Sequence, residues 1–196
     1  MAISETSDKM SSKFKNVVAV AVILIVAAIA FAVGNSGNGS STNGTDGTKV
    51  TSTTLSELQI TLNKGIALIG GGRLADAEVE FQKVLNLEPT NKYALYNIGL
   101  IAQSKKDYPR AIQFYSSALD VDPKFVTARN NRGLAYRDTN QTAKAIEEFE
   151  QAIEDNPNFA LAYFNLGKML VAEGDTAKGN DYLKKAGELD PTLVTK

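Results

Sequence analysis

Hydrophobic and polar positions divide the 196-residue chain into three zones. A polar stretch, residues 1–16, precedes an unbroken apolar run, residues 17–33, which reads VVAVAVILIVAAIAFAV. Residues 34–54 consist mainly of Gly, Ser, Thr and Asn. From residue 55 onward, apolar side chains recur at helical spacing. The pattern therefore predicts a short polar tail, one apolar helix, a linker and a helical domain over residues 55–196.

The apolar run 17–33 has two interpretations. A helix of that length spans about 25 Å, just short of a hydrocarbon core of about 30 Å. As an uncleaved signal anchor, it would hold the lysine-bearing residues 1–16 in the cytoplasm and place the domain outside it. As a signal peptide, it would be cleaved near Ala30-Phe31-Ala32 and leave a secreted or periplasmic protein. Because the apolar run continues through that site without a polar region, we favour a single-pass anchor in the cell membrane.

The polar segment 34–54 has little to bury, so ordering it would cost conformational entropy without return. We expect a flexible linker whose root-mean-square reach is roughly 25 Å. Such a linker would hold a folded domain clear of a membrane surface.

The helical zone has a period of 34 residues and divides into segments 58–91, 92–125, 126–159 and 160–193. Each segment contains two apolar patterns of helical period separated by a turn. Each also closes on a proline at the same register, a residue that biases its predecessor away from helical geometry. These prolines are Pro89, Pro123, Pro157 and Pro191. The spacing predicts four helix-turn-helix hairpins.

Within these segments the order of small, apolar and aromatic residues resembles the tetratricopeptide repeat. The second segment supplies Leu95, Ile98, Gly99, Ala102, Ala111, Tyr115 and Pro123. The first segment departs from the pattern at Thr61 and Lys64, and the third departs at Arg129 and Arg132. The resemblance implies an all-α fold: a right-handed superhelical solenoid of four repeats, here preceded by one transmembrane helix and the linker. It also implies that the first helices line a concave surface.

Four asparagines recur at the same interval, at one position of each first helix. They are Asn63, Asn97, Asn131 and Asn165. In the second repeat, Asn97 falls about 150–200° from the centre of the apolar stripe, so it is expected to face the concave surface. A carboxamide both donates and accepts, which would allow a ladder of asparagines to hold a peptide backbone. Similar ladders occur in other helical-repeat proteins, but the residue is also simply common here in this family, and both interpretations stay open.

The same predicted face carries aromatic, aliphatic and basic side chains. They are Tyr93, Tyr96, Leu100, Leu134, Leu161, Phe164 and Lys168. Exposed apolar groups in a groove would anchor a peptide or a partner protein. The alternative is that they pack against the adjacent repeat.

Composition narrows the function classes. The chain has no Cys and no His, so it lacks thiol chemistry and the commonest general base and metal ligand. Its 21 basic and 22 acidic residues form no concentrated basic face for nucleic acid. We predict no catalytic residue, metal or cofactor, and a non-enzymatic adaptor that binds a protein or peptide outside the cytoplasm. The alternatives are a self-assembling homo-oligomer joined through its repeat ends, or a soluble secreted protein.

Overall fold

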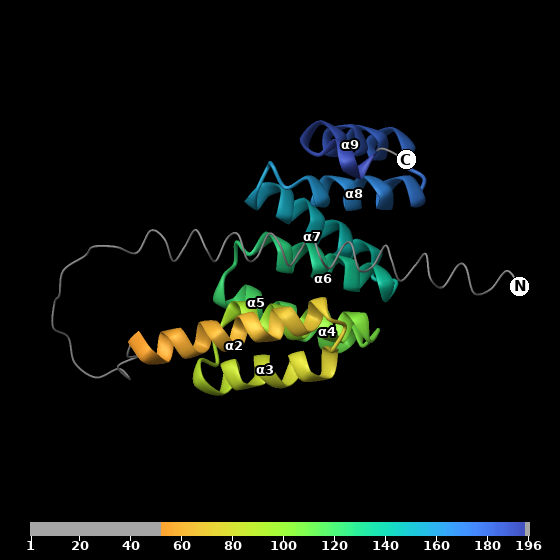
Figure 1. The fold of residues 1–196 in the computed structure, drawn as a ribbon. Helices are drawn as coiled ribbons and strands as arrows, with labels where there is room; N and C mark the ends of the chain where they lie inside the picture. The colour runs from red at the N-terminus through yellow and green to blue at the C-terminus, as the bar shows by residue number, and fades with distance from the viewer. Residues whose placement is uncertain (1–51, 195–196) are drawn as a thin grey trace, which may run out of the picture. The chain divides into compact units, whose positions relative to one another are not determined.

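A computed structural model of the protein describes residues 52–194, with side chains from residue 57 onward (Figure 1). Every regular element in this range is helical, which confirms the predicted all-α class. The elements are α2 (Ser52–Gly70), α3 (Leu74–Leu87), α4 (Lys92–Ser104), α5 (Tyr108–Val121), α6 (Val126–Asp138), α7 (Thr142–Asp155), α8 (Ala160–Ala172), α9 (Thr176–Leu189) and the 3₁₀ turn η1 (Pro191–Leu193). The chain divides into one compact unit that ends at Glu80 and another that begins at Phe81.

Helix α2 begins at Ser52, inside the stretch 34–54 that was predicted to be linker. None of the helices between Ser52 and Val194 is long and apolar enough to cross a membrane. The predicted tail 1–16 and anchor 17–33, together with most of the linker, lie outside the described residues.

In the first unit, α2 and the start of α3 form a hairpin. The apolar residues Leu58, Leu62, Ile66 and Ile69 make up the buried side of α2. The turn that follows closes with a hydrogen bond from the Arg73 amide to the Leu68 carbonyl, at 2.9 Å. The Lys64 ammonium lies 2.9 Å from the Glu80 carboxylate and links the two helices.

The second unit contains three further hairpins, α4/α5, α6/α7 and α8/α9. The second helices α5 and α7 also pack on the first helices that follow them, α6 and α8. The first helices α4, α6 and α8 touch one another in turn, so the hairpins follow each other in register (Figure 1). Because one hairpin cannot bury its apolar side alone, this stacking supplies the core.

Glycine allows the two helices of a hairpin to cross closely. A Cβ at Gly99 would lie 2.6 Å from the Tyr115 ring, and one at Gly133 would lie 2.7 Å from the Phe149 ring. These contacts are shorter than real Cβ atoms tolerate, so the small residue and the aromatic residue require each other.

The helix stops and the turns repeat with the same period as the sequence. The residues that end α5, α7 and α9 are Asp122, Asn156 and Asp190; all have extended backbones and all precede proline, as predicted. The turns inside the hairpins each contain a residue with positive φ, a common way to close a helix. These residues are Gly72, Lys106, Asn140 and Gly174.

Candidate functional site

The candidate binding surface is the side of α4, α6 and α8 that carries the residues singled out from the sequence. Tyr93, Leu100, Leu134 and Phe164 are half-buried there, and Leu161 and Lys168 are exposed. We call this set of six residues the first-helix face. Tyr96 and Asn97 do not belong to it, because their exposed fractions are only 1% and 0%.

The expectation that Asn97 points away from the core into the concave surface is wrong, because its side chain is fully buried. Its Nδ2 donates to the Tyr93 carbonyl one turn earlier at 2.7 Å, and its Oδ1 is buried without a partner among the described residues. Asn97 lies away from the apolar stripe of its own helix, but a first helix in a solenoid is covered from more than one side. Asn63, in the first unit, is exposed and accepts a hydrogen bond from Gln59.

The next two asparagines bind the chain itself. Asn131 Nδ2 donates to the Tyr96 hydroxyl at 2.9 Å, and Asn165 Nδ2 donates to Asn130 Oδ1 at 2.8 Å. Each bond joins a first helix to the first helix before it, 35 residues back in the sequence. Asn130 Nδ2 also approaches Asn131 Oδ1 at 3.3 Å, so the polar contacts run continuously from α4 to α8. These amides hold adjacent repeats in register, at about 0.5–1.5 kcal/mol for each bond.

An aromatic cluster surrounds the first of these bonds. The Tyr96 ring lies 5.1 Å from the Phe125 ring and 5.8 Å from the Tyr115 ring, measured between centroids. The Tyr115 hydroxyl donates to Gln103 Oε1 at 2.6 Å. Burial raises the pKa of both phenols above the ordinary tyrosine value, and the Asn131 hydrogen bond opposes that rise only in part. Tyr96 therefore belongs to the core of the second and third repeats.

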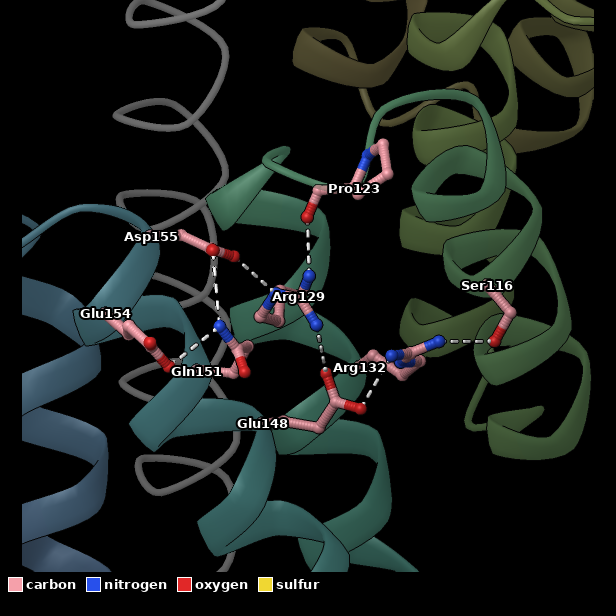
Figure 2. A network of polar contacts seen from close by, with 8 residues as sticks. All are labelled: Ser116, Pro123, Arg129, Arg132, Glu148, Gln151, Glu154 and Asp155. Carbon is pink, nitrogen blue, oxygen red and sulfur yellow. Dashed lines mark hydrogen bonds and ion pairs between the residues drawn. The ribbon is translucent and has the colours of Figure 1, made fainter.

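The two arginines of the third repeat that depart from the family pattern form an ion-pair network (Figure 2). Arg132 donates to Glu148 at 2.6 Å and to the Ser116 hydroxyl at 2.9 Å. Arg129 donates to Asp155 at 2.9 Å and to the Pro123 carbonyl. Figure 2 shows the Glu148 carboxylate between the two guanidinium groups, with Arg129 the farther at 3.8 Å.

This network spans α5, α6 and α7, so it joins the second repeat to the third. The side chains of its four charged members are between 12% and 18% exposed, and opposite charges balance within it. It consequently has the features of a structural clasp.

The sequence carries a signal for this clasp in the spacing of basic and acidic residues. Arg132 and its partner Glu148 are 16 residues apart, and so are Lys64 and Glu80 in the first repeat. At the same two positions, the second repeat has Ile98 and Phe114, and the fourth has Leu166 and Tyr182. In the first and third repeats, a basic residue that departs from the family pattern is therefore accompanied by an acid 16 residues later. The second and fourth repeats have neither the base nor the acid at these positions.

An open pocket of about 370 Å³ lies beside the start of α4. Its lining comprises Glu88, Thr90, Asn91, Lys92, Tyr93, Val121 and Asp122. The Lys92 ammonium contacts the Asp122 carboxylate at 2.6 Å, and this bond lowers the pKa of Asp122. No group of three or more acidic side chains between residues 57 and 194 is placed to hold a metal ion.

Family comparison identifies the repeats. A tetratricopeptide repeat model matches residues 93–125, another matches residues 160–193, and a TPR repeat model matches residues 133–174. Residues 93–125 and 133–193 therefore consist of tetratricopeptide repeats. The three matches begin at the second repeat. The α2/α3 hairpin forms the first repeat, and its turn contains a residue with positive φ, as the other turns do. A comparison with curated proteins found no match to this sequence.

Solved structures agree with this assignment. A structure described as the crystal structure of MamA is 26% identical, with a TM-score of 0.63 over 74% of this chain and 84% of that one. MamA from Desulfovibrio magneticus RS-1 is 28% identical, with a TM-score of 0.61 over 70% of this chain and 78% of that one. PilF of Pseudomonas aeruginosa is 20% identical, with a TM-score of 0.66 over 70% of this chain and 64% of that one, and shows the fold alone.

Proposed function

We propose that this tetratricopeptide repeat protein is a non-enzymatic adaptor that binds a segment of a partner protein on its first-helix face. In this proposal residues 17–33 tether it to the cell membrane and the repeats lie outside the cytoplasm. A protein-interaction scaffold is also the role that similarity to other tetratricopeptide repeat proteins favours.

One observation carries the proposal. Successive first helices present half-buried or exposed apolar groups on one side, Tyr93 and Leu100 from α4, Leu134 from α6, and Leu161 and Phe164 from α8. A row of partly exposed aromatic and aliphatic groups on a rigid scaffold is a common form of protein-binding surface. The asparagines do not contribute the grip expected of them, because Asn97, Asn131 and Asn165 already bond within the chain.

Affinity capture from the native host tests the binding surface. The full chain would be compared with Leu161→Ser on the first-helix face and with Leu87→Ser at the end of α3, whose side chain is 55% exposed. Both variants remove the same side chain from an exposed site, so stability should change little in either. We expect Leu161→Ser to lose partners that Leu87→Ser retains. If both variants retain every partner of the native chain, the first-helix face is not the binding surface.

The tether rests on the apolar run 17–33 and needs its own test. We expect the full chain to remain in host membranes during alkaline carbonate extraction and to keep its N-terminal peptides in mass spectrometry. Release into the soluble fraction, with the sequence starting after Ala32, would replace the anchor by a cleaved signal peptide.

A further inference from the structure

We propose that the exposed side of α8 binds an amphipathic helix of a partner protein that carries a small residue and, seven positions later, a carboxylate. The carboxylate would meet Lys168. This inference rests on the proposed function and assigns the chemistry of the partner at one end of the first-helix face.

The exposed side of α8 is a continuous stripe. Leu161, Phe164 and Lys168 follow at spacings of three and four, and Val171 and Ala172 lie three and four residues beyond Lys168, which puts all five on one side of a helix. Leu161 is 36% exposed and Val171 is 37% exposed. The apolar groups thus flank a single cation.

Internal junctions of the solenoid show what kind of structure this side of a first helix receives. On α4 the corresponding side contacts α6, and on α6 it contacts α8, while each incoming helix packs mainly on the second helix before it, α6 on α5 and α8 on α7. The bond from Asn131 to Tyr96 fixes the register of the first junction, and the bond from Asn165 to Asn130 fixes that of the second. A helix is therefore the element that matches the exposed side of α8.

The same junctions specify a small residue on the incoming helix. At one position the incoming helices carry Ala128 and Ala162, and both are fully buried. Seven residues after the alanine, which is one turn beyond the bonded asparagine, α6 carries Ala135 and α8 carries Met169. The asparagine bonds set the register of the helices, so that Ala135 lies against Leu100 and Met169 lies against Leu134.

On α8 the residue that corresponds to Leu100 and Leu134 is Lys168, so an incoming helix would meet a cation there instead of an aliphatic group. Helices α4, α6 and α8 together contain five basic residues and one acidic residue, whereas α5, α7 and α9 contain five basic and eight acidic residues.

Four of those five basic residues on the first helices are paired with acids of the chain. Lys168 has no hydrogen bond or ion pair among the described residues. A carboxylate at the facing position complements this charge, and an ion pair flanked by apolar contacts favours one partner over others.

A second copy of this chain fits the site poorly. Its exposed first helix, α2, has Ile60 where α4, α6 and α8 all have a fully buried alanine. In the same register α2 would bring Ala67 opposite Lys168, which leaves the cation without a partner. The partner is accordingly a different protein.

A displayed peptide library supplies the probe. Helical peptides of sixteen residues, with random residues on one side, would be selected against the full native chain in detergent micelles and against Lys168→Glu. We expect the native chain to enrich a small residue followed seven positions later by Asp or Glu. Lys168→Glu should weaken these peptides about tenfold or more, while Lys168→Arg stays within about threefold. Peptides with Lys in place of the acid should bind Lys168→Glu and not the native chain.

The alternative outcomes separate the two proposals. Peptides that lose binding to Leu161→Ser but bind Lys168→Glu as well as the native chain would overturn the acidic-helix proposal and leave the proposed function standing. If no selected peptide depends on Leu161 or Lys168, both fall. Sedimentation of the full chain decides the remaining case, because self-association that Lys168→Glu abolishes would make a second copy the occupant. Circular dichroism must give the native helical signal for each variant.

Discussion

The ion pair between Arg132 and Glu148 lends itself to a quantitative test, because the neighbouring repeats carry an apolar pair in the same place. The perturbation is Arg132→Leu alone, Glu148→Phe alone, and both together. The double variant reproduces the combination of aliphatic and aromatic residues found at Ile98 and Phe114. The repeat stack itself thus provides the design of the replacement.

The magnitude follows from burial and from the remaining contacts. The side chains of Arg132 and Glu148 are 18% and 12% exposed, so neither charge is well hydrated. Arg132→Leu leaves Glu148 with only Arg129 at 3.8 Å. Removing one member of a buried ion pair costs about 3–5 kcal/mol, and the residual attraction favours the lower end, about 3 kcal/mol.

The double variant removes both charges, together with the buried Arg132 Nε and Glu148 Oε2 atoms that lack hydrogen-bond partners. Replacing a buried ion pair by packed apolar residues is often neutral or stabilising, so we expect stability within about 1 kcal/mol of the native chain. Arg129 keeps its bonds to Asp155 and to the Pro123 carbonyl in that variant.

Urea unfolding followed by circular dichroism measures all four proteins and yields the coupling energy of the pair. Arg73→Leu serves as the control, because Arg73 and its partner Asp76 are 65% and 53% exposed and breaking this pair should cost less than about 1 kcal/mol. If Arg132→Leu costs no more than Arg73→Leu, or if the double variant is less stable than Arg132→Leu, the Arg132–Glu148 pair does not stabilise the third repeat.

Three further perturbations test other parts of the structure. Asn165→Ala leaves a buried amide of the preceding repeat without its hydrogen bond and should lower the free energy of unfolding by about 1–2 kcal/mol in urea titration. Lys106→Gly relieves a side chain held at a φ of 60° and should raise the free energy of unfolding by about 1 kcal/mol; Asn140→Gly, at a φ of 59°, should give a smaller gain because Asn tolerates this region better. The raised pKa values of Tyr96 and Tyr115 favour the neutral phenols in the folded state, so stability is complete below about pH 10 and should fall as the pH rises above it. Absorbance titration should show two of the seven tyrosines forming phenolate only when the chain unfolds.

Much of the fold could be predicted because local signals and the period agree. The residues before the prolines, such as Asp122, end their helices where expected, and Gly99 and Gly133 lie at the helix crossings. These features depend on contacts within one hairpin, about 34 residues of sequence. A pattern repeated four times fixes such local geometry well.

The candidate site was predicted less well, because its residues are defined by contacts between hairpins. Tyr96 looks like an exposed groove residue on a single helix, but Phe125 and Asn131 from the next repeat help to cover it. Arg132 looks like a charged residue in an apolar position, but it donates to Ser116 of the preceding hairpin as well as to Glu148 of the following helix. Sequence spacing within one helix carries no information about either contact.

The recurring asparagines show why periodicity alone does not separate architecture from binding. A residue that joins each repeat to the previous one must recur every repeat, and so must a residue that holds successive parts of a bound peptide. What distinguishes them is the residue that each asparagine reaches, which is Tyr96 for Asn131 and Asn130 for Asn165. Lys168 occupies the register of Leu100 and Leu134, but it has no hydrogen bond or ion pair among the described residues. Substituting the asparagines therefore tests the stability of the stack, whereas substituting Lys168 tests recognition.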